Sequence, residues 1–256
     1  MNLLYGTGAS PGTAQPGFLP LLLLGGAGVL AGGLAAVSGF GIGSLLTPVL
    51  ALQVGTKLAV AAVAIPHAVG SAQRFWLLRR YVDWRVVRSF GVTSALGGLA
   101  GALLQTRASS RALEIVFGSL LVLAGISELT GWMRRAHWGR SAAWLAGAIS
   151  GALGGLVGNQ GGIRTAAMLG YDVPKESFVA TATAIALFVD AARLPVYLLT
   201  QGREIAGIWG DLLIATGAVM IGTVLGQRIL TRLSQTVFRR VIALLLLGLG
   251  AYMLLP

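Results

Sequence analysis

The sequence contains no cysteine, and its two histidines lie far apart among 256 residues. Without cysteine there is no disulfide bond, thiolate metal site or cysteine nucleophile, and two isolated histidines do not predict a metal site. Charge is also scarce, because only 11% of the residues are charged, 55% are hydrophobic and the mean hydropathy is +0.81. So few polar side chains cannot cover a soluble domain of this size. The composition therefore predicts a membrane protein, with no metal and no cofactor expected.

The net charge of +11 is carried by arginines that gather between apolar runs. They do not form a basic stripe interleaved with aromatic residues, so nucleic acid is not expected as a partner. The positive-inside rule places the segments around 79–88, 134–140 and 228–240 in the cytoplasm, and both termini outside. Residues 1–18 carry no charge and are expected to be an extracytoplasmic segment, not a cleaved signal peptide.

Ten apolar runs follow one another along the chain, and most approach the ~20 residues that a spanning helix needs. The runs at 43–53 and 163–171 are too short, because about 10 residues at ~1.5 Å each reach half of a ~30 Å hydrocarbon core. We predict that each of these two is a half-helix. The runs are 19–38, 43–53, 58–78, 86–105, 112–130, 142–157, 163–171, 176–199, 208–227 and 238–255.

Each half-helix follows a glycine-rich break, and the two breaks lie 119 positions apart. From position 32 to 74, 10 of 43 residues are identical to those 119 positions later, including Arg74 and Arg193. Paired interruptions of hydrophobic segments are typical of transporter binding sites between internal repeats. The two breaks are Gly39-Phe40-Gly41-Ile42-Gly43 and Gly158-Asn159-Gln160-Gly161-Gly162.

A second correspondence, at a shift of 125, pairs Gly97 and Gly101 with Gly222 and Gly226. Small residues four positions apart let helix backbones approach closely, so both pairs are predicted to be packing faces.

Counting crossings from the charged segments gives the topology. The segment 142–175 starts and ends in the cytoplasm, so it is predicted to be a hairpin that enters from inside, whereas 19–57 is a hairpin that enters from outside. Each half then has one hairpin and three further helices, which inverts the second half relative to the first. We therefore predict an all-α integral membrane protein with two inverted-topology repeats. Its parts are an extracytoplasmic segment (1–18), repeat 1 (19–131), a cytoplasmic linker (132–141) and repeat 2 (142–256).

The two tips are predicted to meet near the midplane and to bind an anion. Unpaired N–H groups and the positive end of a helix dipole lie at residues 41–45 and 160–164, and the alternative is a kink that serves packing. Arg164 could add a bidentate charge or snorkel to the cytoplasmic surface. The amides of the second tip can donate to oxyanion oxygens or satisfy their own loop backbone. The predicted substrate-binding residues at the tips are Phe40, Gly41, Ile42, Gly43, Asn159, Gln160, Gly161, Gly162 and Arg164.

Other polar residues fall inside the predicted spans. His67 lies about 15 Å below the outer surface, near mid-bilayer, and is a candidate for proton coupling, the alternative being a neutral hydrogen-bonded histidine. Asp190 is a second candidate, and its position three residues before Arg193 predicts an ion pair. Snorkelling is the favoured explanation of Arg74 and Arg193. Thr181 is predicted to supply a hydroxyl to the substrate or to bond to its own backbone.

The chain resembles the sulfite exporter TauE/SafE family over about residues 20–255. The resemblance rests on the glycine tips, the duplicated layout, the turn at 81–84 (Tyr-Val-Asp-Trp) and the stretch at 180–183 (Ala-Thr-Ala-Thr) after Lys175-Glu176. It implies a multi-pass permease of the bacterial inner membrane, usually viewed as an exporter of sulfite, organosulfonates or related anions. The second tip departs from the family's usual Gly-Gly-Gly-like pattern by carrying Asn159 and Gln160, which leaves the particular substrate open.

We therefore predict a secondary transporter, not an enzyme, that binds a small sulfur-containing anion between the tips and works by alternating access, with proton coupling as a further hypothesis. The expected partners are this anion, membrane lipid and, as an open alternative, a second copy of the chain. The competing interpretations are an anion channel, an uptake permease for another oxyanion or carboxylate, and a scaffold. A membrane-embedded enzyme would need a convergent acid and base, such as His67 within hydrogen-bond reach of Asp190.

Overall fold

The computed structural model describes residues 18–39, 41–132, 140–159, 161, 164, 168, 174–229 and 235–255. Every regular element within these residues is a helix, which confirms the predicted all-α class. Five of the helices in the described ranges are long and apolar enough to cross a membrane: Phe18–Ser38, Trp84–Arg107, Ser110–Thr130, Ser177–Gly207 and Trp209–Gly226. The chain is therefore a multi-pass membrane protein.

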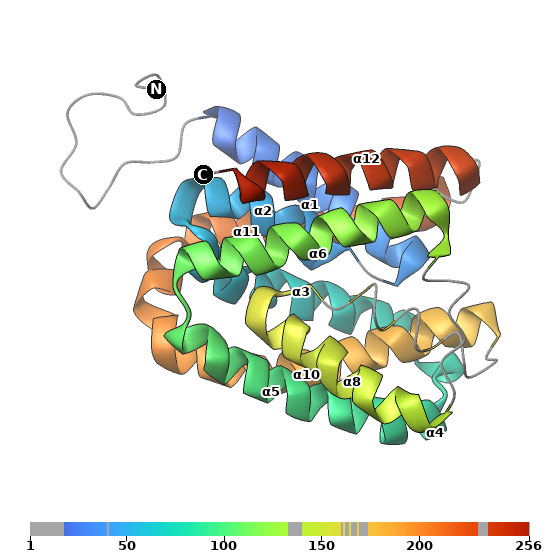
Figure 1. Ribbon diagram of the computed structural model, residues 1–256. Coiled ribbons are helices and arrows are strands. Elements are labelled where there is room, and N and C mark those ends of the chain that lie inside the picture. Colours follow the sequence, from blue (N-terminus) through green and yellow to red (C-terminus); the bar gives the residue numbers. More distant parts are fainter. Residues whose placement is uncertain are drawn as a thin grey trace, which may run out of the picture.

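The first half begins with a helical hairpin, α1 (Phe18–Ser38) and α2 (Ile42–Val54), and continues with helices of different lengths (Figure 1). Asp83 caps the first turn of α4 (Trp84–Val86) with its side chain, and Ser109 does the same for α6 (Ser110–Thr130). The elements are α1 (Phe18–Ser38), α2 (Ile42–Val54), α3 (Thr56–Leu78), α4 (Trp84–Val86), α5 (Val92–Arg107) and α6 (Ser110–Thr130), with a π-helical turn at Val87–Gly91. The short run predicted at 43–53 is confirmed as the 13-residue helix α2.

The second half comprises α8 (Arg140–Val157), α10 (Lys175–Gly207), α11 (Trp209–Ile229) and α12 (Gln235–Leu254). Within α10 the backbone of Gln201 is non-helical, which kinks the helix. The half-helix predicted at 163–171 lies outside the described residues, apart from Arg164 and Met168. The boundaries of the proposed repeats stay a prediction.

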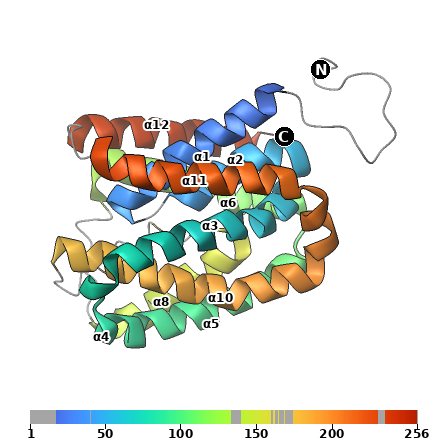
Figure 2. The same ribbon diagram turned by 180° about the vertical axis from the view of Figure 1, so that it is seen from behind.

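Packing between the halves is reciprocal. Helix α1 packs on α11 and α8 packs on α5, so the first helix of each half contacts the next-to-last helix of the other, while α3 packs on α10 and α6 on α12. Figure 2 shows α3 and α10 side by side and antiparallel.

The predicted glycine packing faces are confirmed. A Cβ on Gly97 would lie 2.1 Å from the carbonyl oxygen of Ala148 in α8, and a Cβ on Gly222 would lie 2.1 Å from that of Val29 in α1. Only glycine allows backbones to approach this closely, and such contacts drive helix association in lipid. Close contact between a glycine and a backbone carbonyl therefore holds α1 and α8 each against the opposite half.

Helix α3 lies at the centre and contacts α2, α6, α10 and α11. It is less apolar than α1 or α6 and carries His67, Ser71 and Arg74, all of them buried. Because polar groups in a bilayer are tolerated only where protein or water surrounds them, the enclosed position of α3 is the one that its sequence requires.

Candidate functional site

The first glycine of each break has the same backbone geometry. Gly39 has φ 76° and Gly158 has φ 74°, in the left-handed region that favours glycine. The N–H of each donates to the carbonyl four residues earlier, Ala35 at 2.9 Å and Gly154 at 3.0 Å. A left-handed residue after the last helical turn ends a helix and turns the chain. The breaks therefore end α1 and α8 in the same way, as the repeated sequence predicts.

The two breaks are in contact. A Cβ on Gly43 would lie only 2.2 Å from the carbonyl oxygen of Gly158. Next to this contact, the Ser44 hydroxyl donates a hydrogen bond of 3.3 Å to Oδ1 of Asn159. The tips of the two halves thus touch, with residues 115 positions apart joined by a side-chain hydrogen bond.

Helix α2 begins at the first tip without a side-chain cap. Its N-cap is Gly41, with φ 128°, and the first hydrogen bond of the helix runs from Leu45 N–H to the Gly41 carbonyl. The predicted range 41–45 is therefore one residue too long, because Leu45 is already paired. The N–H groups of Ile42, Gly43 and Ser44 have no partner within the helix, and all three residues are buried.

The ends of the broken helices are held by side chains from elsewhere. Nη2 of Arg164 donates to the Gly39 carbonyl at 3.1 Å, beyond the end of α1. Nη1 of Arg193 donates to the Gly154 carbonyl at 2.5 Å, in the last turn of α8, and the Tyr197 hydroxyl donates to the next carbonyl. The end of a helix carries the negative end of its dipole, so cations and hydroxyls that donate to the carbonyls there stabilise it, and the Gly154 carbonyl accepts from both Arg193 and the Gly158 N–H.

Snorkelling, the favoured sequence explanation of Arg74 and Arg193 and one of two for Arg164, is wrong. The relative exposures are 1%, 1% and 2%, respectively. A snorkelling arginine keeps its guanidinium in water, whereas these three are enclosed. The error has a physical cause: distance along a helix gives depth in the membrane, but it does not show which neighbours surround the side chain.

Asp190 joins the two long central helices. Its Oδ2 lies 2.7 Å from Nδ1 of His67 on α3, and its Oδ1 accepts from Nε of Arg193 at 3.0 Å. The predicted ion pair between Asp190 and Arg193 is confirmed, with Nη2 also 2.8 Å from Oδ1. The contact with His67 is the one that a proton carrier or a membrane-embedded acid–base pair would require.

Arg74 occupies the equivalent place in the first half. Its Nη2 donates to the Ser71 hydroxyl at 3.0 Å, three residues earlier. A shift of 119 positions superposes Arg74 on Arg193 and Ser71 on Asp190. The arginine is thus kept in both halves, but only the second half supplies a carboxylate to neutralise it.

The remaining predicted site residues are Phe40, Gln160, Gly161, Gly162 and Thr181. Phe40, Gln160 and Gly162 lie outside the described residues, while Gly161 is buried. The Thr181 hydroxyl accepts a hydrogen bond of 2.9 Å from the backbone N–H of Asp83, so it fixes the turn before α4. Its predicted contact with the substrate stays a prediction.

Several residues at the site were not predicted from sequence: Ser44, Thr47, Ser71 and Tyr197. Thr47 is fully buried, and its Oγ1 lacks a hydrogen-bond partner in the part of the chain that the structure describes. A Cβ on Gly158 would lie 3.7 Å from this oxygen, which places it beside the second tip. Their positions in the sequence could have identified three of them, because Ser44 and Thr47 lie within the first turns after a break and Ser71 is the repeat equivalent of the ionisable Asp190.

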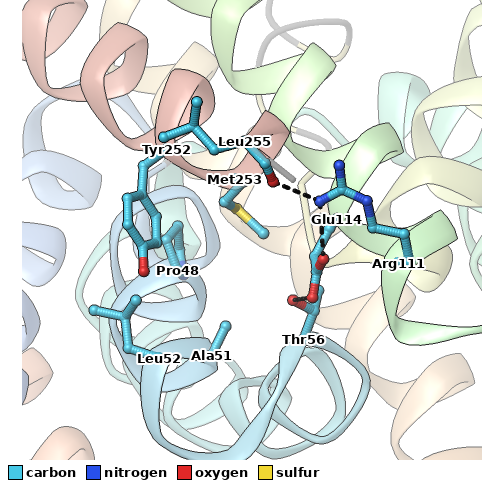
Figure 3. A pocket seen from close by; sticks show the side chains of 9 residues that line it. All are labelled: Pro48, Ala51, Leu52, Thr56, Arg111, Glu114, Tyr252, Met253 and Leu255. Carbon is cyan, nitrogen blue, oxygen red and sulfur yellow. Dashed lines mark hydrogen bonds and ion pairs between the residues drawn. The ribbon is translucent and has the colours of Figure 1, made fainter. Parts of the chain in front are cut away.

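A cavity of about 440 Å³ lies at the opposite end of α2 from the tip. Figure 3 shows Arg111 and Glu114 of α6 on one wall, with Glu114 bonded to Thr56 and Arg111 bonded to the carbonyl of Leu255. The wall opposite is formed by α2 and Tyr252. The residues that line it are Pro48, Ala51, Leu52, Thr56, Arg111, Glu114, Tyr252, Met253 and Leu255.

Comparison with known proteins identifies the family. The chain is 27% identical over 228 residues to a protein of Cupriavidus necator named probable sulfite/organosulfonate exporter TauE, covering 86% of this chain and 88% of that protein. No solved structure matches the chain. The sequence profile of the family described as sulfite exporter TauE/SafE matches residues 24–253. The chain therefore belongs to the sulfite exporter TauE/SafE family, as the resemblance in its sequence indicated.

Proposed function

We propose that this chain is a secondary transporter that exports sulfite, an organosulfonate or a related small sulfur-containing anion across the bacterial inner membrane. The observation that carries the proposal is the contact between the two glycine-broken tips, Gly43 against Gly158, with the buried Arg164 beside it. Helix N-terminal N–H groups and a guanidinium are the groups that bind oxyanions. That the anion contains sulfur is proposed from the family and from the name of the relative from Cupriavidus necator.

The binding proposal is tested by flux and by ligand-induced stabilisation. In proteoliposomes loaded with sulfite, we expect efflux that requires the protein, and we expect sulfite to raise the unfolding temperature of the purified chain. Gly161→Ala adds a methyl group at a buried position of the second tip and should abolish both effects, whereas Gly25→Ala, with nothing within 4 Å of the added Cβ, should abolish neither. If sulfur oxyanions do not stabilise the wild-type protein and the protein does not transport them, the binding proposal is refuted and the scaffold interpretation is favoured.

The transport cycle is proposed to be alternating access between inverted repeats. Reciprocal packing of the halves and the antiparallel α3 and α10 support the inversion. The cavity beside Glu114 is the proposed extracytoplasmic vestibule, and the distribution of arginines supports the proposal that both termini lie outside. The chain has no cysteine, so single cysteines report orientation directly: a membrane-impermeant maleimide added to intact cells should label Leu255→Cys but not Arg80→Cys, and the reverse pattern would invert the topology.

Proton coupling is proposed to run through His67 and Asp190. The groups that act electrostatically on His67 are Asp190 and Arg193 on α10 and Arg74 on its own helix. A proton entering the hydrogen-bonded pair changes the charge within the same buried cluster that would bind the anion, which is what coupling requires. Sulfite flux should increase with a pH gradient in wild type, and His67→Gln should remove this dependence but not downhill flux. Equal wild-type flux with and without the gradient would refute coupling.

The contact between His67 and Asp190 also meets the condition for an embedded enzyme. The family of the chain favours transport. Chemical conversion of sulfite during the flux assay would be the outcome that favours the enzyme.

A further inference from the structure

The buried cluster around the tips has more positive than negative charge. Arg74, Arg164 and Arg193 are all buried, and Asp190 is the only buried carboxylate among the described side chains. With His67 neutral, three guanidiniums and one carboxylate leave two positive charges inside the membrane domain. Burying a charge without a partner is costly, so a bound anion would stabilise a site of this kind.

Arg74 and Arg164 are the two buried guanidiniums without a carboxylate contact among the described residues. Arg193 is paired with Asp190 in a two-nitrogen contact, whereas the partner of Arg74 is the neutral Ser71. Arg164 bonds only to the Gly39 carbonyl among the groups that the structure describes. The Nε and Nη1 atoms of both Arg74 and Arg164 are buried and have no hydrogen-bond partner within the described ranges.

Both guanidiniums converge on the first tip. Arg164 contacts Gly39, the residue at which α1 breaks. A Cβ on Gly70 would lie 3.7 Å from Nη1 of Arg74 and 3.1 Å from Cδ1 of Ile42, the first residue of α2. Arg164 therefore lies at the break before α2, and Arg74 of α3 lies near the side chain of the first residue of α2.

We propose that Arg74 and Arg164 form a two-arginine clamp at the first tip that selects a small oxyanion carrying two negative charges over one carrying a single charge. This inference rests on the proposed function and specifies the charge of its substrate. Two cations with unpaired N–H groups near one tip can each donate a hydrogen bond to a different oxygen of the same tetrahedral or pyramidal anion. A dianion neutralises both, whereas an alkyl sulfonate neutralises one and leaves the other buried and unpaired.

The test compares sulfate with methanesulfonate, which share the sulfur oxyanion but differ in charge. Affinities are measured from the unfolding temperature of the purified full chain at constant ionic strength. Wild type should bind sulfate at least about tenfold more tightly, because hydrogen bonds to a charged group are each worth a factor of about 10 to 100. Arg74→Gln should lose at least about tenfold in sulfate affinity, change little for methanesulfonate and unfold at no lower a temperature when empty, since a buried cation is removed.

The matched control is Arg79→Gln, because Arg79 is exposed and stacks on the Trp76 ring at 4.0 Å just after α3. It should leave both affinities unchanged. If Arg74→Gln fails to fold, Arg74→Lys decides, because it keeps the charge but loses the guanidinium fork and should weaken sulfate binding while preserving the preference for the dianion. Equal wild-type affinity for the two anions, or unchanged sulfate affinity in the Arg74 variant that folds, overturns the clamp but not the transporter. If neither anion, nor sulfite, binds wild type, the proposed function falls with it.

Discussion

Replacing Gly43 by alanine tests the contact between the two tips most directly. The added Cβ would lie 2.2 Å from the Gly158 carbonyl oxygen, whereas ordinary contacts begin at 3.4 Å. The obstructing atom belongs to the backbone of the opposite half, so no side chain can rotate away. The two tips must separate by roughly an ångström, and overpacking of this kind costs about 1–3 kcal/mol.

The cost should appear in the unfolding temperature and in ligand binding. For a chain of this size about 2–4 °C is lost per kcal/mol, so Gly43→Ala should unfold about 2–12 °C below wild type in the same detergent. Sulfite at a hundred times its dissociation constant adds about 2.7 kcal/mol to a protein that binds it. Wild type should show this stabilisation, and Gly43→Ala should lose most of it because the separated tips no longer hold the anion.

Gly25→Ala is the matched control in the same hairpin. Nothing lies within 4 Å of its added Cβ, and alanine is favoured over glycine by about 1 kcal/mol inside a helix, so its unfolding temperature should equal or exceed that of wild type. If Gly43→Ala behaves like this control and keeps sulfite-induced stabilisation, the contact between the two tips does not form the anion site.

Three further changes probe the supporting structure. Asp190→Asn leaves Arg193 buried without its carboxylate and should cost about 3–5 kcal/mol, measured as a lower unfolding temperature; a neutral effect would mean that the pair is solvated. Gly151→Ala places a Cβ 1.9 Å from a backbone oxygen of α5 and should separate α8 from α5, whereas Gly217→Ala, in open space, should not; equal stability of the two would contradict the packing. Tyr197→Phe removes a hydrogen bond to the end of α8 and should cost about 1 kcal/mol; no change in unfolding temperature would show that water replaces it.

Much of the fold could be predicted because the position of a membrane helix depends on the residues of that segment alone. Apolar runs fixed the existence of α1, α2 and α6, and glycine at positions 39 and 158 predicted the breaks, since left-handed backbone favours glycine. The packing faces at Gly97 and Gly222 followed from the spacing of small residues. Periodicity and backbone preference need no knowledge of the partner helix.

The candidate site was predicted less completely. The pair formed by Asp190 and Arg193 was predicted because both residues lie on one helix face. Snorkelling was wrong for Arg74 because burial depends on the surrounding helices, and those helices come from distant parts of the chain. The same limit applied to Ser44, whose partner Asn159 is 115 residues away.

The sequence by itself determined that this protein lies in a membrane, where its helices fall and where the two breaks interrupt them. Composition, the length of apolar runs and the backbone preference of glycine can all be read without knowing which helices pack together. Only the tertiary structure decided that the breaks touch, that α3 is enclosed and that Arg164 reaches across to Gly39. Those features depend on which helix faces pack together, and the energy of a buried charge is set by all of its neighbours at once.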